Sequence, residues 1–341
     1  MKTADLIELL ENKAVRHEDD IFLSGQEIAD ALSLSRTAVW KAIKRAEKEG
    51  YEIESKTGLG YRLVDGKNAF SEASISRALN SRWLGQNDKI VFMDSTDSTN
   101  EEAKRRTKAA SIDEKERLNG TIFVADYQDS GKGRRGRVWE LPPGEGIAMS
   151  YLLTPEIKPD MAPMMTLIMA LSCVSGIIAA TGLKSQIKWP NDIVIGGKKI
   201  VGILTEMSLE NAYISNVIVG TGINVNVGSF PEEIGKNASS LMIEGRQRYS
   251  RTELLCRITE SFESRYEAFL ERGDLGAFLE EYNSICVNAG NRVKVHDPKG
   301  EYEGFAKGIN ERGELIVEKD GGEVLNVYAG EVSVRGVYGY T

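Results

Sequence analysis

The glycine-rich loop from Gly131 to Arg137, with the sequence GKGRRGR, restricts the fold of this chain more than any other segment. It follows an apolar run from Thr121 to Ala125 that predicts a strand, and its glycines match the G-x-G-x-x-G pattern of dinucleotide-binding folds. Those folds need a helix directly after the loop, but Pro142 and Pro143 prevent a long helix here. The loop also lacks the Gly-Lys-Ser/Thr ending of a P-loop, so the sequence argues against both nucleotide-binding folds.

The composition of this loop points to an anionic ligand. Three glycines let the backbone approach a ligand closely, and four cations among seven residues concentrate positive charge. A mobile basic surface loop without a ligand is the alternative.

Further motifs place polar residues at the ends of predicted elements. In Lys188-Trp189-Pro190-Asn191-Asp192, a lysine between apolar runs needs an anionic partner, either Asp192 or a ligand carboxylate or phosphate. Ser98-Thr99-Asn100 precedes a helical pattern, where Ser98 and Glu101 fit a capping box, so capping and ligand binding both stay open. Two weaker motifs are the basic entry into an apolar strand at 198–204 and the glycine-punctuated strand end at 220–226.

Three zones of different sequence pattern predict an α+β protein with several domains, and 341 residues are enough for two or three. Residues 1–64 show short helical patterns and a hairpin, and 65–83 form a polar linker with a helical pattern. Residues 84–287 alternate apolar strand-like runs with helices, as in a mixed α/β domain. Residues 288–341 show short strands between Gly-containing turns, which predict a small β-barrel.

The first zone predicts a winged helix-turn-helix. A short helix from Gln26 to Leu32 is followed by a tight turn and a second helix, capped by Ser35 and running to about Glu49. A hairpin with a Gly-rich tip follows, with strands at Tyr51–Ser55 and Tyr61–Leu63. The predicted DNA contacts, on the second helix and the wing, are Ser35, Arg36, Thr37, Trp40, Lys41, Lys44 and Lys56.

Basic residues are concentrated on the second helix of this first zone. The whole chain has a net charge of -8, so DNA binding needs a local basic patch. The second helix carries Val39, Ile43 and Ala46 on a core face and a row of lysines on another face. A solvated lysine face on an ordinary helical subdomain is the alternative, but the succession of helix, turn, helix and wing favours DNA binding.

Composition argues against several other classes of protein. Three cysteines without a Cys-x-x-Cys pair do not suggest a disulfide framework, and two distant histidines argue against a zinc site or a Ser-His-Asp triad. The apolar run from Met161 to Ala180 contains Pro163 and several small polar residues, so it predicts a buried core helix and not a membrane span. The first residues lack a signal-peptide pattern, and we expect a cytoplasmic protein without a membrane partner.

Taken in order, these motifs resemble the biotin protein ligase family over nearly the whole chain. The basic glycine loop followed by Lys-Trp-Pro-Asn-Asp is specific to that family, and the related lipoate ligases lack this combination. The resemblance implies a class II synthetase-like catalytic fold of the biotin–lipoate ligase type. It also implies the N-terminal winged helix of bifunctional biotin operon repressors and an SH3-like C-terminal barrel.

The resemblance implies roles for individual residues. Those matched to biotin binding are Ser98, Thr99, Asn100, Gln128, Lys132, Gly133, Arg134 and Lys188. Those matched to ATP or adenylate binding are Arg134, Arg135, Arg137, Trp139, Asn191, Lys199 and Asn224. Lys188 and Arg134 take the catalytic roles. The family loop often has arginine where Lys132 stands, and a lysine cannot bind an anion in the same bidentate way.

The implied reaction joins biotin and ATP, with Mg²⁺ on the triphosphate, into biotinyl-5'-AMP and pyrophosphate. Biotin then passes to a lysine of a biotin carboxyl carrier protein, in acetyl-CoA carboxylase or another biotin-dependent carboxylase. The repressor role implies operator DNA as a partner and a homodimer formed on biotinyl-AMP binding. Two alternatives stay open: a lipoate or octanoate protein ligase, and a metabolite-sensing transcription regulator without catalysis.

Overall fold

The computed structural model describes residues 3–14, 22–65, 70–297, 300–328 and 333–336. These residues form two compact units. The first contains the chain up to Ala78 together with Ser250–Glu253, and the second contains Leu79–Tyr249 together with the chain from Leu254 on. Each unit is described by itself.

The first unit is a winged helix-turn-helix, as the sequence predicts. Its helices and strands are α1 (Thr3–Ala14), α2 (Gly25–Ala31), α3 (Arg36–Lys48), β1 (Glu52–Lys56), β2 (Gly60–Asp65) and α4 (Glu72–Ala78). Strands β1 and β2 pair antiparallel as the wing. The Ser35 hydroxyl accepts a hydrogen bond from the backbone N–H of Ala38 at 3.2 Å, which confirms the predicted cap of α3.

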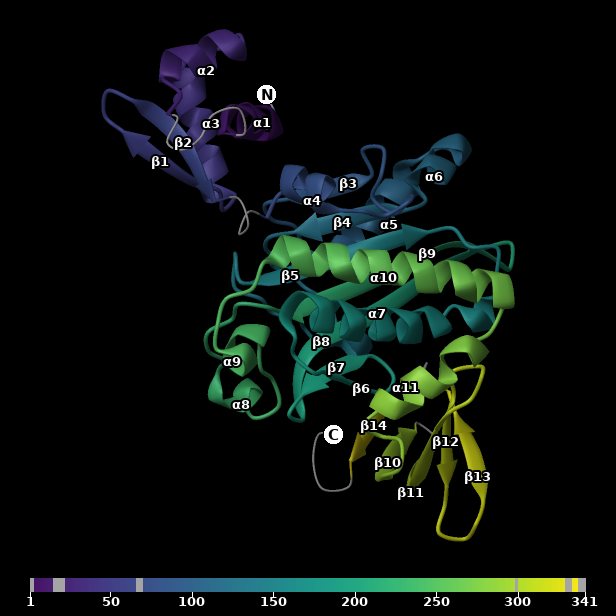
Figure 1. The fold of residues 1–341 in the computed structure, drawn as a ribbon. Helices are drawn as coiled ribbons and strands as arrows, with labels where there is room; N and C mark the ends of the chain where they lie inside the picture. The colour runs from purple at the N-terminus through teal and green to yellow at the C-terminus, as the bar shows by residue number, and fades with distance from the viewer. Residues whose placement is uncertain (1–2, 15–21, 66–69, 298–299, 329–332, 337–341) are drawn as a thin grey trace. The chain divides into compact units, whose positions relative to one another are not determined.

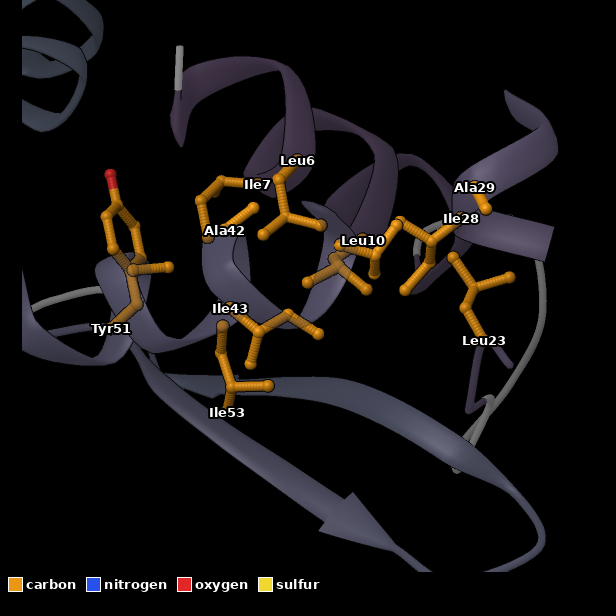
Figure 2. Packing of buried hydrophobic residues seen from close by; sticks show 12 residues of the cluster. Leu6, Ile7, Leu10, Leu23, Ile28, Ala29, Ala42, Ile43, Tyr51 and Ile53 are labelled. Carbon is orange, nitrogen blue, oxygen red and sulfur yellow. The ribbon is translucent and has the colours of Figure 1, made fainter. Parts of the chain in front are cut away.

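The core of this unit comes from α1, α2, α3 and the wing (Figure 2). Leu6 and Ile7 of α1 pack with Ile43 of α3 and Ile53 of the wing, and all four are buried. The predicted core face of α3 is confirmed, because Val39, Ile43 and Ala46 are each at most 1% exposed. The lysines of the predicted polar face are exposed, so α3 has its basic side available for a partner.

The second unit is built on a seven-stranded sheet of order β3-β4-β5-β9-β8-β7-β6 (Figure 1). The strands are β3 (Ile90–Met93), β4 (Thr121–Ala125), β5 (Gly146–Leu153), β6 (Gln186–Lys188), β7 (Asp192–Ile195), β8 (Lys198–Glu210) and β9 (Tyr213–Asn224). Strands β3 and β4 are parallel, and every other neighbouring pair is antiparallel. Mixed strands and helices in one unit agree with the predicted mixed α/β domain.

Helices cover both faces of this sheet. Successive residues of a strand point to opposite faces. Ser150 bonds to Thr99 and Asn100 of α5 (Thr99–Ala109), whereas Tyr151 bonds to Thr259 of α10 (Arg251–Arg272). Helices α5 and α10 therefore lie on opposite faces, and Figure 1 shows α7 (Met164–Thr181) running alongside α10. A second short helix, α6 (Ile112–Leu118), follows α5 before β4 begins.

Helix α7 is the apolar run that the sequence assigns to the core. The segment Pro159–Thr181 is long and apolar enough to cross a membrane by length and composition, but 72% of its most apolar window is buried within the protein. Its side chains pack against the sheet and against α10, where Gly176 lies next to Ile258. The predicted core helix is confirmed.

A buried carboxylate fixes the segment that enters this unit. Glu263 on α10 accepts hydrogen bonds from the backbone N–H groups of Arg82 (2.8 Å), Trp83 (2.8 Å) and Leu84 (3.0 Å). Burial alone would raise the pKa of Glu263, but these backbone hydrogen bonds outweigh it and lower the pKa. The carboxylate therefore stabilises a turn that has no regular secondary structure of its own.

The C-terminal part is a five-stranded antiparallel sheet of order β13-β12-β11-β10-β14. Its strands are β10 (Arg292–Asp297), β11 (Gly300–Ile309), β12 (Leu315–Glu318), β13 (Val324–Val327) and β14 (Ser333–Gly336), preceded by α11 (Leu279–Ile285). The indole N–H of Trp189 donates to the carbonyl of Gly313 at 3.1 Å, and the backbone N–H of Trp189 donates to Asn288 at 2.8 Å. These bonds tie the small sheet to the turn between β6 and β7.

Candidate active site and DNA-binding surface

A pocket opens on the face of the large sheet that carries α5. Its walls come from the start of α5, the glycine loop, the turn between β6 and β7, and the glycines of β8 and β9. The predicted site residues that line it are Ser98, Thr99, Asn100, Gln128, Lys132, Gly133, Arg134, Trp139, Asn191 and Lys199. Lys188, Arg135, Arg137 and Asn224 do not line it.

Hydrogen bonds fix the polar wall at the start of α5. The Thr99 backbone N–H donates to Gln128 Oε1 at 2.8 Å, and the Ser150 hydroxyl lies 2.7 Å from Thr99 Oγ1 and 2.6 Å from Asn100 Oδ1. The capping alternative is wrong, because the Ser98 side chain makes no capping hydrogen bond although Ser98 is the N-cap residue. Its hydroxyl belongs to the pocket wall instead.

Ser150 was missed in the sequence. It is the single polar residue within the buried strand β5, whose sequence is GIAMSYLL. A polar residue in a fully buried strand needs a hydrogen-bond partner, and that signal would have pointed to it.

The glycine loop forms a small closed turn. The Gly133 N–H donates to the Arg137 carbonyl, and the Trp139 N–H donates to the Gly131 carbonyl, both at 2.8 Å. Arg135 has a φ of 58°, so the turn reverses without a regular helix, in line with the prediction that no long helix follows the loop.

The cations of this loop point in different directions. Arg134 is directed inward, where its Nη1 donates to Asn191 Oδ1 at 2.8 Å. Burial lowers the pKa of Arg134, the charge of Asp192 opposes this shift, and the charges of Arg135 and Arg137 lower the pKa further. An arginine nevertheless stays protonated at neutral pH. Arg135 and Arg137 are exposed on the outer side of the loop. The loop therefore brings one arginine to the pocket and leaves two outside it.

The Lys-Trp-Pro-Asn-Asp motif forms the turn from β6 to β7. Lys188 is the last residue of β6 and only 6% exposed, so this lysine is buried as the sequence predicts. Asp192 Oδ1 pairs with Lys199 Nζ at 2.6 Å, and Asn191 donates to the Ile203 carbonyl of β8 at 3.0 Å. The turn and the start of β8 thus share one polar network beside the pocket.

Trp139 lies on a floor made of glycine. A Cβ atom at Gly202 would come within 2.8 Å of its ring, and one at Gly222 within 2.3 Å of its indole nitrogen. Only glycine at these two positions allows the indole to approach the sheet this closely. The Lys199 ammonium stands 5.3 Å from the centre of the ring, in the range of a cation–π contact.

The buried indole N–H of Trp139 has no hydrogen-bond partner among the described residues, so a donor is available in the pocket wall. Asn224 is buried away from the lining, and its Nδ2 donates to the Ser239 carbonyl at 3.0 Å. In the described parts of the chain, no group of three His, Cys, Asp or Glu side chains is placed to hold a metal ion.

The first unit presents a second concave surface, between α3 and the wing. Predicted DNA contacts that line it are Arg36, Thr37, Trp40 and Lys56. Trp40 is 53% exposed, although a large aromatic side chain is usually covered. Lys41 and Lys44 are exposed on α3 outside this groove, and Lys44 pairs with Glu47 at 2.6 Å. Ser35 caps α3 with its hydroxyl.

Known protein families match both the part of the chain that forms the pocket and the part that forms the groove between α3 and the wing. Residues 92–224 match the Biotin/lipoate A/B protein ligase family, residues 5–62 match an HTH domain, and residues 289–335 match the Biotin protein ligase C terminal domain. The chain is 38% identical over 97% of its length, and 98% of the relative's, to the bifunctional ligase/repressor BirA of Bacillus spizizenii. The chain belongs to the family of bifunctional biotin protein ligases.

More distant members of the biotin protein ligase family match as well. Bifunctional ligase/repressor BirA of Escherichia coli is 27% identical over 92% of this chain and 93% of its own length. The solved structure of the Aquifex aeolicus biotin protein ligase in complex with biotin and ATP superposes with a TM-score of 0.63 and 29% identity. That superposition covers 72% of this chain and 98% of the Aquifex chain. The α+β fold class predicted from sequence is thereby confirmed.

Proposed function

We propose that this chain is a bifunctional biotin ligase and repressor. It joins biotin and ATP into biotinyl-5'-AMP and transfers biotin to a lysine of a biotin carboxyl carrier protein. It also binds operator DNA. We place the protein in the cytoplasm. The observation that carries the ligase proposal is the pocket itself, where a hydroxyl and amide wall meets Arg134 and Lys199. A relative with this overall fold is described in complex with biotin and ATP.

The polar wall suits the ring system of biotin. Thr99 and Gln128 supply hydroxyl and amide groups that are fixed by each other and, from behind, by the buried Ser150 hydroxyl. A ureido ring needs such polar groups in a mostly apolar site. The Trp139 indole adds an apolar face and an unpartnered N–H donor. We assign biotin to this wall and the adenylate to the side of Trp139, Asn191 and Lys199.

The cationic side suits the reaction. A carboxylate oxygen of biotin attacks the α-phosphorus of ATP, the bond to the bridging oxygen breaks, and pyrophosphate leaves with the electron pair. Both reactants are anions, so fixed cations such as Arg134 and Lys199 lower the repulsion and stabilise the charge that develops on phosphate. Mg²⁺ on the triphosphate would neutralise further charge. In the second step a lysine amine attacks the acyl carbon, AMP leaves, and the amine loses a proton.

Biotin-dependent exchange of labelled pyrophosphate into ATP tests the ligase proposal. We expect exchange with biotin and little with lipoate or octanoate, and a rise in melting temperature with biotin alone. Preference for lipoate or octanoate would assign the chain to the related ligases. Ligand binding without any exchange would make it a sensor without catalysis.

The DNA-binding residues give a second, independent prediction. Arg36 lines the groove near the start of α3, whereas Lys41 lies further along the exposed basic side. We expect Arg36→Ala to weaken binding to the specific site by about 1–3 kcal/mol and to relax its sequence preference. Lys41→Ala should weaken binding to all sequences alike, as for a phosphate contact. The slope of the logarithm of the binding constant against the logarithm of the salt concentration should fall in magnitude by about one.

Salt titrations on the selected operator and on a scrambled duplex separate these effects. Glu8→Gln on α1 is the control, because its side chain is exposed and lies outside the groove. Equal losses on both duplexes for Arg36→Ala would remove this residue from base recognition.

We further propose that biotinyl-AMP promotes a homodimer. One winged helix contacts only a half-site, whereas a dimer contacts two half-sites at matched spacing. The ligand drives dimerisation only as far as it binds the dimer more tightly, and about 1–3 kcal/mol is usual for such coupling. Sedimentation with and without biotin plus ATP should therefore give dimer dissociation constants that differ by about 5- to 150-fold. Equal constants would mean that the ligand does not regulate assembly.

A further inference from the structure

An ion pair joins the glycine loop to helix α5. Lys132 Nζ lies 2.9 Å from Glu101 Oε1. The same carboxylate pairs with Lys104 at 2.8 Å, Lys104 pairs with Glu206 at 2.7 Å, and Glu206 accepts a hydrogen bond from Asn100 at 2.8 Å. One continuous polar chain therefore runs from the loop, across the first two turns of α5, to strand β8 and back to the pocket wall.

The direction of the Glu101 side chain is informative. Glu101 stands at the third position of α5, where a glutamate after an N-cap serine usually turns back to close a capping box. Here the box is not formed, and the carboxylate points to Lys104 and Lys132. Hydrogen bonds from Lys104 and Lys132 lower the pKa of Glu101, so the carboxylate is ionised at neutral pH. In place of the helix cap, the carboxylate contacts one lysine of its own helix and one lysine of the loop.

The partner residue is tied into the loop through its backbone. Lys132 forms an isolated backbone β-bridge with Val138 on the other side of the loop, and the next residue, Gly133, donates its backbone N–H to the carbonyl of Arg137. Arg134, which follows directly, points to Asn191. Holding the Lys132 side chain against α5 therefore restrains the whole turn that carries Arg134.

We propose that Glu101 is a positioning residue that holds the glycine loop over the pocket through Lys132, so that Lys132 is a latch and not a ligand contact. Arg134 is then the cation of this loop that meets the anionic ligand. The inference deepens the proposed ligase function and revises the role that family resemblance implies for Lys132.

The two roles of Lys132 predict opposite effects for one substitution. If Lys132 bound the ligand anion, Glu101 would compete for it, and Glu101→Gln would strengthen adenylate binding. If Glu101 and Lys132 form a latch, Glu101→Gln opens the loop and weakens adenylate retention. An exposed or half-exposed pair of this kind typically changes an equilibrium by about two- to fivefold.

The experiment uses the full-length chain with Glu101→Gln, Lys132→Met and the double variant. The first readout is cleavage by an arginine-specific protease at Arg134, Arg135 and Arg137 without any ligand. The second is the rate at which preformed biotinyl-AMP leaves the protein. We expect both rates to rise about two- to fivefold in each single variant, with no further rise in the double variant.

Glu102→Gln is the matched control. Glu102 is the next residue on α5 and pairs with Arg105 and Arg106 of the same helix, so its loss should change neither rate. Lys104→Met tests whether the effect of Glu101→Gln runs through Lys104 instead. If Lys104→Met alone reproduces that effect and Lys132→Met does not, the latch is wrong.

Two other results would overturn the proposal: unchanged cleavage in Glu101→Gln, or slower release of the adenylate from it. The cleavage readout needs no ligand. If the wild type shows no biotin-dependent chemistry, the ligase function is refuted, but the cleavage rates still decide whether Glu101 and Lys132 hold the loop.

Discussion

Replacing Lys188 by methionine should lower the rate of adenylate formation on the order of 100-fold. Lys188 ends β6, is 6% exposed, and adjoins the turn that carries Asn191 into the pocket wall. The expected size follows from the catalytic role that family resemblance implies for Lys188, which does not itself line the pocket. Loss of one cation that stabilises charge developing on phosphate costs about 3 kcal/mol. Methionine keeps the aliphatic volume, so the free energy of unfolding should change by less than about 1.5 kcal/mol.

Single-turnover formation of biotinyl-AMP measures this effect directly. Lys184→Met is the matched control, because Lys184 precedes the same strand and is exposed. We expect its rate to stay within about twofold of the wild type, as for surface substitutions in general. A near-normal rate for Lys188→Met would show that Lys188 has no catalytic role, and a lower melting temperature beside that rate would show that its role is structural.

The largest stability effect is expected at Glu263. Glu263→Ala removes one carboxylate that accepts from three backbone N–H groups and leaves these donors without a partner. The free energy of unfolding of the second unit should fall by about 3 kcal/mol. Its melting temperature should fall by roughly 6–12 °C, since each 1 kcal/mol shifts a unit of this size by about 2–4 °C.

The effect of this carboxylate depends on pH with a defined sign. The pKa of Glu263 is lower in the folded state than in the unfolded state. Its contribution to stability is therefore fully present above the ordinary glutamate pKa of about 4.3, and it is lost as pH falls from there through the lower folded-state pKa. The difference in stability between wild type and Glu263→Ala should therefore shrink below pH 4 or so. Glu271→Ala, exposed on the same helix, should change the free energy of unfolding by no more than about 0.5 kcal/mol. A pH-independent difference would contradict the ionised role.

Local patterns predicted the elements well. Ser35 was identified as the cap of α3, and the spacing of Val39, Ile43 and Ala46 identified the buried side of that helix. The strand Thr121–Ala125 was predicted with the bounds that β4 has. Each of these features depends on residues that are close together in the sequence, so the local sequence pattern is enough to predict it.

Features that join distant segments were harder to predict. Ser98 and Glu101 match a capping box in sequence, but besides Lys104 of its own helix Glu101 pairs with Lys132 of the glycine loop, a partner that sequence spacing does not reveal. Asn224, which resemblance assigns to the adenylate, does not line the pocket and donates to the carbonyl of Ser239. In each case the partner lies at least 15 residues away, and only the folded sheet decides which atoms meet.

The glycine floor under Trp139 limits how this pocket could be redesigned for a bulkier acid. A common strategy trims a wall residue to make room for an added group on the substrate. At Gly202 and Gly222 no side chain is left to trim, and any substitution would push the indole off the sheet. Extra room has to come from the start of α5, where Thr99 lines the pocket and the buried Ser150 hydroxyl lies 2.7 Å from Thr99 Oγ1. Shortening Thr99 removes this hydrogen bond, but Ser150 keeps Asn100 Oδ1 as its acceptor at 2.6 Å. A single substitution at Thr99 therefore adds room without leaving a buried hydroxyl unpaired.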